Sequence, residues 1–251
     1  MSDTPRPSST GSDLDRAARY QEILIDFSRM VSESGDLQRL LQLTTLQAAR
    51  GIGIRHTKLM RYRQEHGDLL IVAGVGWSPG VVGHVTVGTD VRSPAGCALQ
   101  SRQPVTVEDL PNNPEFRYPP VLRDHGIVAV LNVLVAVDGT VWGVLEVDSE
   151  VSRHFGQTDI NFQLMMANIL GSAIHSRQAL EAATSVGAEA ALALTQYKTL
   201  FSERDLPREH RTHVYRGPSS SGIAVGMRIT AHPPHRSVRA AFPHTAPTSG
   251  V

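Results

Sequence analysis

The sequence predicts an α+β fold in which helices cover an antiparallel sheet. Two apolar runs, Ile127–Val137 and Thr140–Val147, flank the dipeptide Asp138-Gly139, which tolerates the positive φ angles of a two-residue hairpin turn. Apolar residues at helical spacing occur at both ends of this region, over 13–35 and from Asp159 onward. Strands joined by hairpins pair antiparallel, so we expect antiparallel core strands between long N- and C-terminal helices.

The composition fits a globular protein and disfavours several partners. The chain has 251 residues, 24 basic and 24 acidic side chains, and 41% hydrophobic residues, which is enough to bury a core. A net charge of zero disfavours nucleic-acid binding through bulk charge. The single cysteine, Cys97, cannot form an intramolecular disulfide, and no apolar run approaches the ~20 residues of a membrane span. We expect a cytoplasmic protein that binds neither nucleic acid nor a membrane.

The N-terminal part is expected to hold a leader and a helix with an apolar seam. Residues 1–12 are polar and rich in Ser, Pro and Thr, so we predict a disordered leader. Asp13 then caps a helix in segment 13–35, because apolar residues follow in alternating steps of three and four. The seam includes Leu24, Phe27 and Val31. Such a helix needs a partner, which indicates a dimer or signalling helix.

A second helix and a set of short strands follow. Asp36 is the N-cap of a helix that Gly51 ends. Beyond it the apolar period changes to that of strands, which are expected at 56–64, 69–74, 81–87 and 105–107. Between the last two, Ser93 caps a short helix over 94–101.

A long loop over 110–123 separates these strands from the core hairpin. It is rich in Pro and Asn and has apolar anchors of its own, Phe116, Tyr118 and Leu122. A long loop with apolar anchors is commonly a lid or a binding loop.

The final helix begins at Asp159 and carries a heptad stripe longer than one domain face. The stripe includes Phe162, Met166, Ile169, Ala173, Leu180, Leu194 and Phe201. At ~1.5 Å per residue, such a helix reaches ~65 Å. We therefore expect its second half, 178–206, to leave the domain and pair with a second copy as a coiled coil.

The last segment, 207–251, differs from the rest of the chain. It has six arginines, no lysine, one acidic residue and six prolines, without helical or strand periodicity. We predict a disordered basic tail, either a functional tail or the product of a shifted or truncated reading frame. It lacks the Lys/Arg clusters with interleaved aromatic residues that favour nucleic-acid binding.

Motifs along 36–177 resemble the GAF domains of bacterial signalling proteins. They are Leu37–Gly51, Gly96-Cys97-Ala98-Leu99, Pro104-Val105, Asp109-Leu110, Gly126-Ile127, Trp142-Gly143-Val144-Leu145-Glu146-Val147-Asp148, Phe155, Asp159, Phe162 and Ala167-Asn168. The resemblance implies a six-stranded antiparallel sheet with a small-molecule pocket between one sheet face, the short helix and the long loop. It also implies a sensor that binds a ligand or dimerises through its flanking helices, with no catalytic residues.

The pocket that the resemblance implies has candidate lining residues in this sequence: Trp77, Cys97, Phe116, Tyr118, Leu122, His125 and Asn132. Asn132 interrupts an apolar run, so its amide needs a hydrogen-bond partner, either a neighbouring backbone group or a ligand. Glu146 and Asp148 are candidates for pocket carboxylates, although alternation along a strand favours an outward, solvated face for both.

Cys97 raises an alternative function, a chromophore- or redox-sensing domain. Some relatives attach a bilin to a cysteine, usually with a histidine beside it, but Ala98 follows here. Others reduce free methionine sulfoxide with several thiols, and this chain has one. The spaced Asn-Lys-Phe…Asp-Glu set of the cyclic-nucleotide subgroup is not found either. We expect Cys97 to be a small packing residue, and we predict no cofactor and no metal.

The segment after Arg177 resembles the approach to the phosphoacceptor helix of bacterial histidine kinases. Arg208-Glu209-His210-Arg211 is similar to a phosphoacceptor box, but the downstream Asn and helical hydrophobic residues are missing. The resemblance implies a truncated sensor histidine kinase of a two-component system, without its catalytic core and without enzyme activity. Its partner would be an output kinase or a response regulator.

Overall fold

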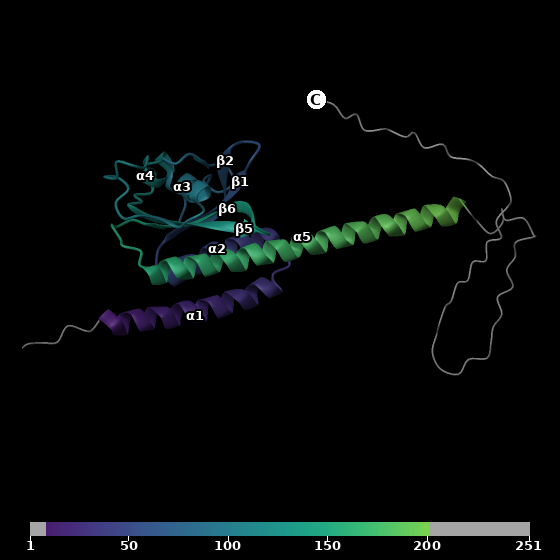
Figure 1. Ribbon diagram of the computed structural model, residues 1–251, viewed down its shortest axis with the longest axis horizontal. Coiled ribbons are helices and arrows are strands. Elements are labelled where there is room, and N and C mark those ends of the chain that lie inside the picture. The colour runs from purple at the N-terminus through teal and green to yellow at the C-terminus, as the bar shows by residue number, and fades with distance from the viewer. Residues whose placement is uncertain (1–8, 201–251) are drawn as a thin grey trace, which may run out of the picture. The chain divides into compact units, whose positions relative to one another are not determined.

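The computed structural model describes residues 9–200, with side-chain surroundings for 14–196 (Figure 1). Its centre is a six-stranded sheet in the order β3-β2-β1-β6-β5-β4, in which every neighbouring pair is antiparallel. The strands are β1 His56–Arg63, β2 Asp68–Val75, β3 Thr86–Gly88, β4 Val105–Val107, β5 Ala129–Val137 and β6 Thr140–Ser149. The α+β fold with six antiparallel strands is therefore confirmed.

Helices cover the two faces of this sheet unequally. The long helices α1 Ser9–Glu33, α2 Leu37–Ile52 and α5 Gln157–Leu200 lie on one side. The short helices α3 Pro94–Ser101 and α4 Pro120–Asp124 lie on the other side with the long loop (Figure 1). We call these two sides the helix face and the loop face, and we call the short helices and the long loop together the loop layer.

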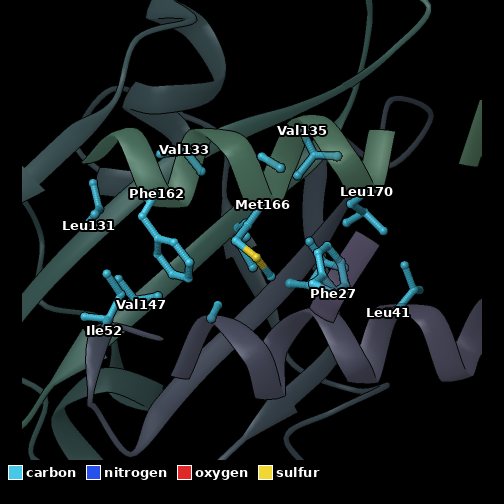
Figure 2. Close-up of a cluster of buried hydrophobic side chains, with 14 of the residues drawn as sticks. Phe27, Leu41, Ile52, Leu131, Val133, Val135, Val147, Phe162, Met166 and Leu170 are labelled. Atoms are coloured by element: carbon cyan, nitrogen blue, oxygen red, sulfur yellow. The ribbon is translucent and has the colours of Figure 1, made fainter. Parts of the chain in front are cut away.

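The helix face carries an apolar core. Figure 2 shows Phe162, Met166 and Leu170 of α5 gathered with Leu131 of the sheet and Ile52 of α2. Strand alternation explains why the strands contribute apolar residues to this face, because every second residue of a strand points to the same face. A fully buried layer of this kind contributes ~1.5–3 kcal/mol for each large apolar side chain.

Close approach of α5 to the sheet requires a glycine. A Cβ added at Gly171 would collide with the carbonyl oxygen of Ala136 on β5. The helix backbone therefore lies directly on the strand, and a side chain at this position would push the two elements apart.

The predicted caps of two helices are present. The Asp36 carboxylate accepts a hydrogen bond from the backbone N–H of Arg39 at 2.8 Å. Helix α2 ends at Gly53 in the left-handed region, two residues beyond the expected Gly51. Ser93 caps α3 by accepting from the backbone N–H of Gly96. These local interactions satisfy helix-terminal groups that have no partner inside the helix.

Several element boundaries differ from the sequence-based expectation. The strand expected at 81–87 is reduced to β3, because the Val85 N–H turns back to the Val81 carbonyl and Gly83 has a φ of 87°. Helix α1 begins at Ser9, so residues 9–12 are helical instead of disordered. Helix α5 begins at Gln157, and α4 forms inside the long loop.

Helix α5 continues without a break past the domain. Every described side chain from Gln178 to Gln196 is exposed, and the helix itself extends to Leu200. None of the described helices combines the length and the apolar composition needed to cross a membrane. The expected tail 207–251, residues 1–8 and Phe201 lie outside the described residues.

Candidate functional site beneath the loop layer

The loop face contains a buried charged cluster, formed by Lys58 on β1 with Glu146 and Asp148 on β6. The Lys58 Nζ lies 2.5 Å from Glu146 Oε1 and 2.6 Å from Asp148 Oδ1. The lysine pairs across strands with Glu146, and Asp148 lies two residues further along β6 on the same face. All three side chains are at most 3% exposed. A buried ion cluster in an otherwise apolar sheet is costly to desolvate, so its position calls for a functional explanation.

The charges of this cluster do not balance if every group is ionised. Burial alone would lower the pKa of the Lys58 ammonium, but attraction to Asp148 and Glu146 outweighs burial and raises it. Burial raises the pKa of the Asp148 carboxyl well above its ordinary value; Lys58 opposes this rise and Glu146 adds to it. One lysine therefore serves two carboxyl groups, and burial favours the protonated form of Asp148.

Asn132 of β5 lies beside the charged cluster, and we call Asn132, Lys58, Glu146 and Asp148 together the polar row. The Asn132 amide has no hydrogen-bond partner among the described residues. Asn132 pairs across strands with Glu146, so the two side chains share the loop face. Asn132 is fully buried, yet among the described residues neither its Oδ1 nor its Nδ2 has a hydrogen-bond partner; Asp148 Oδ2 has none either, although the Asp148 carboxyl is within hydrogen-bonding reach of the Glu146 carboxyl. Leaving such a group unpaired costs ~1–3 kcal/mol. Three polar atoms on neighbouring strands are therefore open to an added partner.

Trp77 covers the cluster on the β2 side. Its Nε1 donates a hydrogen bond to the Thr57 carbonyl at 2.7 Å, and the Lys58 Nζ lies 4.6 Å from its ring centroid. A Cβ at Gly74 would lie 2.7 Å from the Trp77 Cδ1, so glycine makes room for the indole. The ammonium is thus held by two carboxylates and an aromatic face, the contacts that stabilise a cation in proteins.

His125, at the end of α4, joins the loop layer to the turn after β2. Its Nδ1 lies 2.8 Å from the Val121 carbonyl oxygen, and its Nε2 accepts from the Ser78 backbone N–H at 3.0 Å. A carbonyl only accepts, so Nδ1 donates to Val121, while Nε2 faces both the N–H and the hydroxyl of Ser78. Its centroid is 4.9 Å from that of Trp77, and the two rings form one aromatic wall.

His56 lies next to the cluster, opposite Asp148 in the sheet. Burial lowers the pKa of the His56 imidazole, although Glu150 opposes this; its Oε1 is 3.2 Å from the His56 Nδ1. The ring also contacts Trp77 edge-on, at 5.2 Å between centroids. It therefore extends the aromatic wall toward the end of β6.

The structure brings five of the seven predicted pocket residues together. Leu122 is buried in an apolar cluster with Val130 of β5, and Phe116, Tyr118 and Trp77 pack against it. The Tyr118 hydroxyl donates to the Ile127 carbonyl at 2.7 Å. His125 joins them through Trp77. Together these residues fasten the loop layer over the sheet.

The other two predicted residues occupy separate places. Cys97 is half-buried on α3, where its N–H donates to the Ser93 carbonyl. Asn132 lies on the sheet below, in the polar row.

The charged cluster itself was missed from the sequence. The expectation that Glu146 and Asp148 face solvent is wrong: alternation puts both on one face, but the loop layer covers that face. A signal was available in Lys58, a lysine inside an apolar strand of a chain with few lysines. A lysine at such a position indicates that a buried acidic partner is needed, but it does not indicate which residue that partner is.

A second surface lies between α1 and α5 on the helix face. Tyr20 stacks on Phe162 at 4.2 Å between centroids and donates to Asp159 Oδ1, so the two helices run in parallel. Burial, together with this hydrogen bond, raises the pKa of the Tyr20 phenol. Beside this contact is an apolar groove of about 370 Å³ that includes Leu24 and Met165.

The residues predicted for a dimer seam divide into three groups. Leu24, Val31 and Ala173 are half-buried and line grooves between α1 and α5. Leu180 and Leu194 are exposed, at 66% and 55%. Phe27 is fully buried in the domain's own core, so its assignment to a dimer seam is wrong. The reason is that α1 turns this side toward α2 and the sheet. Phe201 lies outside the described residues.

Comparisons with known proteins agree on one kind of domain. The model of the GAF domain family matches residues 36–174. The chain is similar to the GAF domain of a phosphoenolpyruvate-protein phosphotransferase from Coxiella burnetii, at 20% identity and a TM-score of 0.60, over 66% of this chain and 98% of that one. Among curated proteins, no significant match is found.

Two further solved structures share the fold. A free methionine-R-sulfoxide reductase from Neisseria meningitidis is 23% identical over 71% of this chain and 99% of its own, with a TM-score of 0.57. A putative GAF sensor protein from Burkholderia vietnamiensis is 19% identical over 63% and 94%, with a TM-score of 0.54. At these identities the likeness establishes the fold alone.

Proposed function

Because the chain belongs to the GAF domain family, a family of signalling sensor domains, we propose that it binds a small molecule beneath its loop layer and signals as a homodimer through α1 and α5. The proposed ligand site is the polar row of the loop face, and the proposed output is the parallel helix pair. We further propose that it acts in the cytoplasm.

The observation that carries the ligand proposal is the set of unpaired polar atoms on Asn132 and Asp148. A domain that needed this face only for stability would gain from apolar residues here, as on the helix face. Buried polar atoms without partners are retained at a cost in stability, and such costs are typical of binding sites.

A short route connects the proposed site to the helices. Trp77 donates to the carbonyl of Thr57, the residue before Lys58. The Thr57 side chain points the other way and donates to the Thr45 carbonyl of α2 at 2.9 Å. A shift of Trp77 on ligand binding would therefore move β1 and, through it, α2.

Arg177 is placed to carry such a shift to the exit of α5. Its guanidinium donates to the carbonyls of Ser34 and Gly35, in the turn between α1 and α2. Beyond Arg177 all described side chains of α5 are exposed. Arg177 thus links all three long helices where α5 leaves the domain, which supports the helices as the output.

The dimer proposal is supported by the exposed apolar residues of α5. Leu180 and Leu194, which are two heptads apart, are each more than half exposed in the single chain. Apolar residues at heptad spacing on a free helix are buried when a second helix pairs with it. We propose that the output is exerted on a kinase or response regulator, and that the chain derives from a sensor histidine kinase without its catalytic core.

A second candidate function is redox or chromophore sensing through Cys97. The favouring observation is that the half-buried thiol lies on α3, which packs against β5 and β6 beside the polar row. Absorbance of the purified protein tests it. A visible band that is lost in Cys97→Ala supports this function, and a colourless protein that binds a metabolite unchanged in Cys97→Ala rejects it.

Ligand binding is tested by thermal unfolding of the full chain against a panel of metabolites. A ligand at a hundred times its Kd stabilises the folded state by ~2.7 kcal/mol, which gives a clear rise in Tm. Failure of every compound in the panel to raise Tm would count against ligand sensing.

Dimerisation is tested separately by light scattering. We expect the mass of a dimer for the native chain and of a monomer for the double variant Leu180→Asp with Leu194→Asp. Glu189→Gln on the same helix is the matched control and should stay dimeric. A native chain that is monomeric at micromolar concentration would contradict the dimer.

A further inference from the structure

We infer that the ligand of the loop face is a small uncharged molecule with an amide edge, such as a carboxamide, a urea or a lactam ring, paired with the side chain of Asn132. This inference rests on the proposed ligand-sensing function and specifies its chemical class. It depends on the charge of the buried cluster and on which polar atoms are left without partners.

The cluster offers no free cation to an anionic ligand. The Lys58 ammonium already contacts Glu146, Asp148 and the face of Trp77. A carboxylate or phosphate would have to displace one of these carboxylates. An organic ammonium only donates hydrogen bonds, so it would leave the Asn132 Nδ2 without an acceptor. An ion that entered without its own counter-charge would be buried unpaired, which is strongly unfavourable.

The atoms that remain are those of a hydrogen-bonding amide. Asn132 offers one acceptor, Oδ1, and one donor group, Nδ2, side by side in one plane. A ligand amide presents a carbonyl oxygen and an N–H on one edge and pairs with both atoms through two parallel hydrogen bonds. Asparagine uses the same geometry to hold the edge of an adenine ring.

Asp148 supplies a third contact to the same molecule. Its Oδ1 is bound to Lys58, and its Oδ2 is buried without a partner. Asn132 and Asp148 are on adjacent strands, since Asp148 pairs with Val130 and Asn132 with Glu146. A molecule with a second polar atom next to its amide edge would therefore satisfy all three open atoms at once.

Access to this site requires the loop layer to move. Asn132 and Asp148 are fully buried, and the layer above them is fastened by a few side-chain bonds. These include His125 with Ser78 and Arg117 with Asp90, both between segments of the loop face. A compact ligand that enters beneath them would be enclosed when they re-form, which suits a sensor with a bound and a free state.

Three probes that share a pyridine ring but differ in charge test the chemical class of the ligand. Nicotinamide carries the amide, nicotinate the carboxylate and 3-picolylamine the ammonium. In titration calorimetry and thermal unfolding of the full chain, we expect nicotinamide to bind at least tenfold more tightly than the other two. Tighter binding of nicotinate or 3-picolylamine at this site would overturn the class but leave ligand sensing intact.

Asn132→Leu tests the residue, because leucine has nearly the shape of asparagine without its polar atoms. We expect the free variant to have a higher Tm than the native chain and to lose the nicotinamide-induced rise. Asn112→Leu, at an exposed asparagine of the loop, is the control and should keep that rise. Unchanged nicotinamide binding in Asn132→Leu would overturn the assignment of this residue.

An internal water is the competing partner of the same polar atoms. In that case Asn132→Leu lowers Tm, since the bonds of the water are lost, and none of the three probes binds. That outcome overturns the inference. The wider metabolite panel then decides whether ligand sensing fails with it: a compound of any other class that raises Tm keeps the proposed function, and a silent panel rejects both.

Discussion

The two faces of the sheet are built from the same strands on different principles. On the helix face, β6 contributes Leu145 and Val147 to an apolar layer closed by three long helices. On the loop face, the alternate residues of the same strand, Glu146 and Asp148, form a buried ion cluster under short helices and loops. The comparison indicates that stability is concentrated on one face and specificity on the other.

The difference extends to how each face is covered. The helix face is covered by continuous packing, so removing one side chain leaves a cavity. The loop face has two smaller apolar clusters, around Met60 and Leu122, and its cover is fastened in addition by individual hydrogen bonds such as those of Trp77 and Tyr118. A cover held by separate bonds opens locally at lower free energy than a packed helix layer does. The loop face is therefore the one suited to admit a ligand.

Lys58→Met is expected to have the largest effect on the loop face. It leaves two buried carboxyl groups without their cation, which lowers the free energy of unfolding by ~3–5 kcal/mol. Replacing the whole cluster, by adding Glu146→Leu and Asp148→Leu, makes this face resemble the helix face and should restore most of the loss. Urea denaturation measures both. A single variant as stable as the native chain would show that the cluster contributes nothing.

Phe162→Ala tests the helix face, where stability comes from apolar packing and not from ion pairs. The side chain is 2% exposed and stacks on Tyr20, so its removal leaves a cavity that costs ~3–5 kcal/mol. No second substitution nearby should restore this loss in the way that the cluster variants do. Val151→Ala, at a 67% exposed residue, is the control and should change stability by less than ~0.5 kcal/mol.

Asp148→Asn is expected to change the free energy of unfolding by a smaller amount, and this amount depends on pH. The pKa of Asp148 is raised in the folded state, so the folded chain holds its proton where the unfolded chain has lost it. The stability from this group is complete below the unfolded pKa of ~3.9 and is lost as pH rises through the folded value.

The change from this single proton is at most ~1.4 kcal/mol per pH unit. Denaturation midpoints measured upward from about pH 4 should therefore fall less steeply for Asp148→Asn than for the native chain. The same slope in both proteins would contradict a raised pKa of Asp148 in the folded state.

Much of the fold follows from local sequence signals. The caps at Asp36 and Ser93 and the hairpin at Asp138-Gly139 are set by interactions within a few residues. The expectation fails where a distant partner decides the outcome. The segment 81–87 has strand composition, but only Thr86–Gly88 pairs with β2. Phe27 fits a dimer seam by spacing, yet it is buried against the domain's own core.

The candidate site was only partly accessible from the sequence for the same reason. The loop anchors, Trp77 and His125 were expected from the resemblance to the family, and Asn132 stood out as well because it interrupts an apolar run. The ion cluster was missed because Lys58 is 88 residues from Glu146 and 90 from Asp148. A period of two assigns Glu146 and Asp148 to one face but does not say whether that face is covered.

The sequence by itself determined the order of helices and strands, the antiparallel hairpins and the apolar layer, because period, caps and turns act over short distances. Tertiary structure alone decided that a second layer covers the polar side of β6 and that Lys58 meets two carboxylates there. Burial depends on which segments come together in space, and the raised pKa of Asp148 follows from that burial.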